Sequence, residues 1–417
     1  MNPKPEVTED LRMVEEVAVG SRTPSPGADR ALIFTIHDGS QIPRHLFGER
    51  TAEVLAQPEI SRAYIRERDW GANLVARELA REIGAASYTR VNLARVVMDF
   101  GRFPGCSSVG AEYLRRHAIF PPLEHLLSEQ ERHELLARYY DGASRTFVDQ
   151  FARRRLTVAV HSYDPCNSSG TERPEISLVA RSLEYQWTST MPPYIFDPLF
   201  PPELCETTCQ RYLSYRMLAD LERDGWRTAL NYPYIMPEGS VEIRAQVWLF
   251  FRYLRERFLA AFPEHWEEPG YQRVWQLLLD VTRRSGEAER LRAFLHRYRE
   301  APRDSQELFA EARRAYSKIR RFTEAQREQL LTDYRFSTQR TSCLGIEIRK
   351  DLLCEVDRER GLARLLPDAE HTARRIAACM APAVRELVAE SAAGDTTPDA
   401  LRGQDTLDPQ FTSPVVS

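Results

Sequence analysis

Two short apolar runs, each followed at once by a histidine, constrain this chain more than any other feature. ALIFTI (31–36) precedes His37, and LTVAV (156–160) precedes His161. Short runs of large and β-branched apolar residues are typical of buried strands. Further short runs of this kind alternate with helical patterns, which is typical of a parallel sheet covered by helices. We therefore expect an α/β protein with three layers, α/β/α, and a mostly parallel central sheet.

Other segments fit this alternation of strands and helices. Residues 69–83 carry apolar side chains four positions apart and end before Gly84, as in an amphipathic helix with a glycine cap. Helical patterns also cover 128–153. Further strands are expected in four runs: SYTRV (87–91), SLVA (177–180), WRTALNYPY (226–234) and GIEIR (345–349).

Composition divides the chain into five parts. Residues 1–28 and 391–417 are polar and contain Pro, Gly and Ser, so we expect disordered tails. Residues 241–335 show an apolar helical face and then a strongly charged stretch, which predicts a helical insertion. The α/β domain is expected to comprise 29–240 and 336–390.

Charge and hydropathy exclude several classes of protein. The 57 Lys and Arg residues are balanced by 61 Asp and Glu residues, and this near-neutral balance argues against a nucleic-acid partner. No run approaches the roughly 20 apolar residues that a membrane span needs, and the start of the chain lacks the pattern of a secretory signal. The seven cysteines are scattered without a CxxC pair. We therefore expect a cytoplasmic protein in a reduced compartment, without a membrane partner.

The two strand-end histidines suggest a metal site. If their strands are parallel neighbours, His37 and His161 lie at the same edge of the sheet, where ligands bind in open α/β sheets. A catalytic zinc typically takes three protein ligands, so a carboxylate is needed beside the two histidines. Asp69 is the first choice for this third ligand, and Glu67 is the second. The alternative is that the histidines are ordinary polar residues and that Asp69 caps the following helix.

Two arginines beyond the strand at 87–91 are candidate substrate-binding residues. Arg95 and Arg102 can present forked donors to a carboxylate, with Asp99 orienting one of them. A surface ion pair explains the same spacing equally well.

A carboxylate in the strand at 345–349 is a candidate acid/base. Glu347 lies between two isoleucines, and a buried strand carboxylate needs either a salt bridge or a chemical function such as proton transfer. Glu242 is followed by the same two residues, Ile and Arg, in VEIRA, but its context is helical, so it ranks lower.

The order of these motifs resembles the N-formylglutamate amidohydrolase family. Six motifs occurring in the family's order are more specific than any one of them. They are IHDGSQIP (36–43), RDWGANLVARELAREIGA (68–85), NLARVVMDFGR (92–102), VAVHSYDP (158–165), NYPY (231–234) and GIEIRKDLL (345–353).

The resemblance implies a fold related to zinc carboxypeptidases and the hydrolysis of an N-acyl amide, typically the formyl group of N-formylglutamate. One zinc ion per chain would polarise the amide carbonyl and lower the pKa of its water toward about 7. By this resemblance the zinc ligands are His37, Asp69 and His161, the residues that bind a substrate carboxylate are Arg95, Arg102 and Asn231, and the acid/base is Glu347.

Departures from the family pattern concern the substrate more than the fold. Gly101 stands where the family tends to have Asn, and the segment YYDGAS (139–144) lacks the family's histidine. We expect an amidohydrolase acting on an acylated amino acid, a peptide or a pathway intermediate that carries a carboxylate. A second hypothesis is a degenerate hydrolase fold that binds a ligand or partner protein through the helical insertion, and an arginine-driven nucleic-acid module is the weakest.

Overall fold

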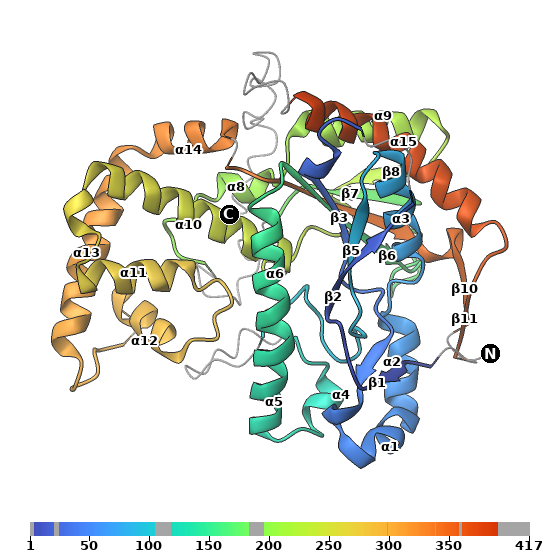
Figure 1. Cartoon of the computed structure of the whole chain (residues 1–417), viewed down its shortest axis with the longest axis horizontal. Coiled ribbons are helices and arrows are strands. Elements are labelled where there is room, and N and C mark those ends of the chain that lie inside the picture. Colours follow the sequence, from blue (N-terminus) through green and yellow to red (C-terminus); the bar gives the residue numbers. More distant parts are fainter. Residues whose placement is uncertain are drawn as a thin grey trace.

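A seven-stranded sheet forms the centre of the molecule (Figure 1). The computed structural model describes residues 4–20, 25–104, 118–182, 196–297, 299–337, 339–357 and 361–390. In spatial order the strands are β2 (Val14–Ala18), β5 (Ser87–Val91), β3 (Ala31–Thr35), β6 (Leu156–Tyr163), β9 (Ser342–Arg349), β7 (Ile176–Val179) and β8 (Thr228–Leu230). Only the β2–β5 and β7–β9 pairs are antiparallel. The predicted mostly parallel sheet is confirmed.

The N-terminal segment is part of this sheet. Strand β2 pairs with β5, and β1 (Glu6–Thr8) pairs with β4 (Gln41–Pro43). Val19 and Ala28 are buried. The prediction of a disordered tail is therefore wrong for residues 4–20 and 25–28, because the polar composition of the acidic strand β2 gave no sign that it pairs with β5. The second expected tail, 391–417, lies outside the described residues.

Helices cover both faces of the sheet, which confirms the three-layer prediction (Figure 1). On one face α15 (Ala369–Glu390) packs against α3 (Ala72–Glu82) and α9 (Arg211–Arg223). On the other face lie α6 (Asp141–Phe151) and α10 (Val241–Ala261), which contact each other. Shorter helices fill the connections: α1 (Thr51–Ala56), α2 (Pro58–Glu67), α4 (Pro121–Glu124), α5 (Glu129–Leu135) and α8 (Glu203–Glu206).

The predicted helical insertion is helical and lies to one side of the sheet (Figure 1). After α10 it contains α11 (Pro269–Leu279), α12 (Gly286–Leu295), α13 (Gln306–Ala325) and α14 (Arg327–Phe336). However, α10 is also an integral part of the layer that covers the sheet, because it packs against α6. The remaining strands, β10 (Cys354–Asp357) and β11 (Leu362–Leu365), form a hairpin after β9.

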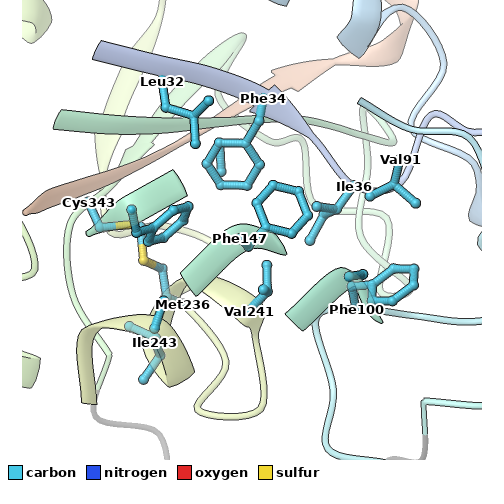
Figure 2. Packing of buried hydrophobic residues seen from close by; sticks show 14 of the residues in the cluster. Leu32, Phe34, Ile36, Val91, Phe100, Phe147, Met236, Val241, Ile243 and Cys343 are labelled. Carbon is cyan, nitrogen blue, oxygen red and sulfur yellow. The ribbon is translucent and has the colours of Figure 1, made fainter. Parts of the chain in front are cut away.

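Aromatic packing fixes which face of the sheet carries the candidate site. The ring of Phe34 in β3 lies 5.1 Å from that of Phe147 in α6, and Figure 2 shows both in the buried cluster with Val241 of α10. Phe34 pairs with Ala159 of β6, so His161, two residues further on, faces the same helical layer. The site therefore lies between the sheet and the α6–α10 layer.

Two strand predictions need adjustment. Strand β6 continues through His161 to Tyr163 and does not stop before the histidine. The strand expected over 226–234 is confirmed only at Thr228–Leu230, since Asn231 adopts a left-handed backbone with φ 55°. Among the described helices, none is long and apolar enough to cross a membrane.

Candidate metal centre

The two histidines meet because their strands are parallel neighbours. His37 follows the end of β3 by two residues, and His161 is the third residue from the end of β6. Their ring centroids are 5.1 Å apart. The prediction that both side chains lie at one edge of the sheet is confirmed, although His161 belongs to its strand.

Asp69 completes a group of three potential ligands. Its Oδ2 atom lies 3.0 Å from Nδ1 of His161 and 3.5 Å from Nδ1 of His37. Each residue offers one ligand atom, and these atoms all lie within 4.8 Å of one another. The alternative carboxylate, Glu67, pairs instead with Arg66 at 2.7 Å. The structure thus brings Asp69, and not Glu67, to the histidines.

The side chain of Asp69 is available because another residue caps the helix. Helix α3 begins at Ala72, and the Asn73 N–H donates to Oδ2 of Asp38 at 2.9 Å. Oδ1 of Asp38 in turn accepts from Nε of Arg68 at 2.7 Å. The helix-cap interpretation of Asp69 is therefore wrong, since Asp38 satisfies the exposed helix donor.

Each histidine has a second carboxylate behind it. Nε2 of His37 lies 2.8 Å from Oδ1 of Asp99, and Nε2 of His161 lies 3.7 Å from Oε1 of Glu242. Metal-binding histidines usually direct their other ring N–H to a carboxylate or carbonyl. Both Nδ1 atoms here face Oδ2 of Asp69, while both Nε2 atoms face outer carboxylates. This arrangement fits a cation bound by two Nδ1 atoms and one carboxylate oxygen.

The third ligand candidate is held by an arginine. Nη1 of Arg95 donates to Oδ1 of Asp69 at 3.0 Å, which leaves Oδ2 directed at the histidines. Arg95 also donates to Oδ2 of Asp99 from Nη2 at 3.1 Å, and Nε of Arg102 donates to the same atom at 2.8 Å. Burial opposes ionisation of Asp99, yet Arg95 and His37 hold its pKa well below the usual range. The guanidinium of Arg95 is thus already engaged by two carboxylates, whereas that of Arg102 is partly exposed.

Gly101 permits the close approach of this loop to His37. Its N–H donates to Oδ1 of Asp99 at 2.8 Å. A Cβ atom at this position would lie 2.9 Å from that oxygen and 3.4 Å from Cε1 of His37. A larger residue here would displace the carboxylate that contacts His37.

Two further carboxylates, Glu347 and Glu242, lie beside His161. Glu347 in β9 pairs directly with His161 of β6, and burial raises its pKa to about 7. Glu242, in the first turn of α10, is 3% exposed, and its Oε2 is buried without a hydrogen-bond partner. Burial opposes its ionisation, but His161 lowers the pKa of Glu242 overall. Burial therefore favours the protonated form of Glu347, whereas His161 favours the ionised form of Glu242.

The first turn of α10 reaches the site through contacts that are distant in sequence. The Val241 N–H donates to the carbonyl of Phe100 at 3.0 Å. A Cβ atom on Gly239 would lie 2.4 Å from the Phe103 nitrogen, so only glycine allows this approach. From the sequence, Glu242 ranks below Glu347, because its helical context gives no sign that α10 packs against the loop after β5.

Asn231 shapes a turn beside the site. Its Oδ1 atom accepts the Ala180 N–H at 2.8 Å, and its own N–H donates to the Leu178 carbonyl at 2.8 Å. The Ser177 hydroxyl donates to the Tyr232 carbonyl, which fixes the NYPY segment over β7. The substrate-binding role of Asn231, like that of Arg95 and Arg102, stays a prediction.

Comparison with known proteins places the chain in a class of enzymes. The fold and the group of ligands define an α/β protein with a potential metal centre. The sequence model of the N-formylglutamate amidohydrolase family matches residues 30–283, which is more than half of the chain. The chain belongs to this family and is an amidohydrolase-like hydrolase, so the resemblance found in the sequence is confirmed. No curated protein matched the sequence.

Two solved structures are similar over most of the chain. An N-formylglutamate amidohydrolase from Ralstonia eutropha JMP134 has 13% identity and a TM-score of 0.45, covering 91% of this chain and 100% of the other. A gene product of Agrobacterium tumefaciens has 16% identity and a TM-score of 0.40, covering 91% of this chain and 93% of the other. Because both TM-scores are low, the family assignment depends on the sequence match alone.

Proposed function

We propose that the protein is a zinc-dependent amidohydrolase that cleaves an N-acyl, N-formyl-type amide of a carboxylate-bearing amino acid, peptide or pathway intermediate. The observation that carries this proposal is the group of buried His37, buried Asp69 and partly buried His161, with ligand atoms within 4.8 Å of one another. Two imidazoles and one carboxylate are a common donor set for a catalytic zinc with an open position. One ion per chain is expected.

The residues around this group have different roles in the proposed reaction. Zinc, when bound, supplies Lewis acidity that polarises the acyl carbonyl and acidifies water. Glu347 accepts a proton from the attacking water and delivers it to the leaving nitrogen, for which a pKa of about 7 is well suited. Asp99 and Glu242 orient the two histidines, and Arg95 orients Asp69.

The decisive experiment is elemental analysis of protein purified without a histidine tag, next to the His37→Ala/His161→Ala double variant. We expect about one equivalent of zinc in the parent and none in the variant, by the three-ligand argument. The parent should then hydrolyse members of a panel of N-acyl amino acids. A parent chain without stoichiometric metal, together with unchanged hydrolysis by His161→Ala, would contradict the proposal.

The partner-binding alternative would require a degenerate site. All three candidate ligands are instead in place, and each has a second partner. Moreover, the first turn of α10 contributes Glu242, so the start of the helical insertion serves the hydrolase site. We therefore prefer the enzyme proposal, and residues 284–335, beyond the family match, are where a partner-binding function would be tested.

A further inference from the structure

Arg173, in the loop between β6 and β7, lies against two neighbouring tyrosine rings. Its guanidinium carbon lies 5.4 Å from the ring centroid of Tyr163 and 5.0 Å from that of Tyr234. The two rings are 6.3 Å apart and nearly perpendicular, at 78°. Aromatic faces attract a guanidinium and fix its plane. We call these three residues, Tyr163, Arg173 and Tyr234, the Arg173 clamp.

The Arg173 clamp lies next to the proposed acid/base. Tyr163 follows His161 by two residues in β6 and so projects from the same face of the sheet. Ser177 of β7 pairs with Glu347, and its hydroxyl holds the Tyr232 carbonyl, two residues before Tyr234. The clamp therefore borders the site on the side of Glu347.

The charge of Arg173 is not balanced by a carboxylate of the protein. Within the described residues, no Asp or Glu forms an ion pair with it, and its Nε is buried without a hydrogen-bond partner. Its Nη1 donates to the backbone carbonyl of Asp164 at 3.3 Å. The neighbouring Arg349, by contrast, pairs with Glu172 at 2.7 Å and Asp351 at 2.6 Å. A partly buried cation without an anionic partner is costly, and a bound anion would relieve that cost.

Building on the proposed function, we propose that Arg173 binds the substrate's carboxylate and selects N-acyl compounds that carry one. Because no Asp or Glu of the described residues pairs with the guanidinium, its N–H groups remain available to bind an anion, and their fork matches the geometry of a carboxylate. Tyr234 is 42% exposed, so the clamp is open to solvent. Arg95 is less suited to this task, since Asp69 and Asp99 already engage its donors.

The test measures binding to zinc-loaded full-length chain carrying Glu347→Gln, so that the probe is not consumed. The probes are N-formyl-L-glutamate and its diamide, which has the same shape without the charges. Titration calorimetry should show the acid binding at least about 10-fold tighter than the diamide in this parent, as expected for a charge-assisted pair. Arg173→Gln should bring this ratio close to one, and Arg173→Lys should keep part of it.

Arg227→Gln is the matched control, because Arg227 is an exposed arginine that pairs with Glu172, the residue before Arg173. It should leave the ratio unchanged, and thermal melts should show that all variants fold. If Arg173→Gln leaves the ratio of acid to diamide affinity unchanged, the inference is wrong. A loss of this ratio in Arg102→Gln would then assign the substrate carboxylate to Arg102. A parent that holds zinc but binds neither probe overturns both the inference and the proposed substrate class. An Arg173-dependent ratio in a chain without zinc supports the inference and overturns the zinc proposal.

Discussion

Two arginines border the candidate site, and they differ in how their charges are balanced. Arg95 donates to Asp69 and Asp99, so its charge is neutralised by the protein itself. Arg173 lies against two neighbouring tyrosine rings and has no carboxylate partner among the described residues. A cation neutralised from within holds other side chains in place, whereas a cation without a counter-charge is ready to bind a ligand. The same chemical group thus has two different functions within one site.

The largest effect is expected from removing the neutralised arginine. Arg95→Gln leaves the buried carboxylates of Asp69 and Asp99 without their main cation, which should cost about 3–5 kcal/mol of unfolding free energy. Urea unfolding of the metal-free protein measures this. Arg66→Gln, which removes an exposed pair with Glu67, is the control and should have a much smaller effect. Equal costs for the two variants would contradict the assignment of Arg95.

A similar comparison applies to the two carboxylates that face His161. Burial raises the folded-state pKa of Glu347 from 4.5 to about 7, so the folded state binds this proton more tightly than the unfolded state. Stability is therefore lost as the pH rises from about 4.5 through about 7, and Glu347→Gln removes this loss. We expect the variant to gain up to about 3 kcal/mol over the parent at pH 8 and little at pH 4.

Denaturant unfolding of both metal-free proteins at the two pH values checks this prediction. Glu355→Gln, at a largely exposed position in β10, is the matched control and should show no such pH dependence. A gain that is the same at pH 4 and pH 8 would mean that the Glu347 carboxylate is not destabilised by burial.

Glu242 should affect the metal more than the fold. Its Oε1 atom faces Nε2 of His161, and loss of such an outer partner typically lowers metal affinity by about 10–100-fold. We expect Glu242→Gln to weaken zinc binding by this factor in a competition titration with a chromophoric chelator. Glu238→Gln, a buried position just before α10, serves as the control. Unchanged zinc affinity in Glu242→Gln would remove it from the set of orienting residues.

The smallest effect is expected from removing the unbalanced arginine. Without ligand, Arg173→Gln removes a cation that has no carboxylate partner, so the unfolding free energy should change by less than about 1 kcal/mol. The same urea experiment as for Arg95→Gln measures it. A loss as large as that of Arg95→Gln would show that Arg173 is a structural residue and would blur the distinction between the two arginines.

Local patterns were sufficient for the elements that carry the ligands. The apolar runs at β3 and β6 and the four-residue spacing in α3 identified two strands and a helix that lies between them in the chain. The short acidic strand β2 was missed, because its pairing with β5 depends on a partner about 70 residues away. The strand expected over 226–234 was too long, because apolar composition does not reveal the turn at Asn231.

The sequence by itself determined that His37 and His161 each follow a buried apolar run and that a carboxylate, Asp69, precedes the next helix. Only the tertiary structure decided between alternatives that are locally identical. Asp69 is free for the histidines because Asp38 caps α3, and Glu242 reaches His161 because α10 docks on the loop after β5. Strand and helix formation depends on neighbours in the chain, whereas the pairing of charges depends on which distant segments fold together.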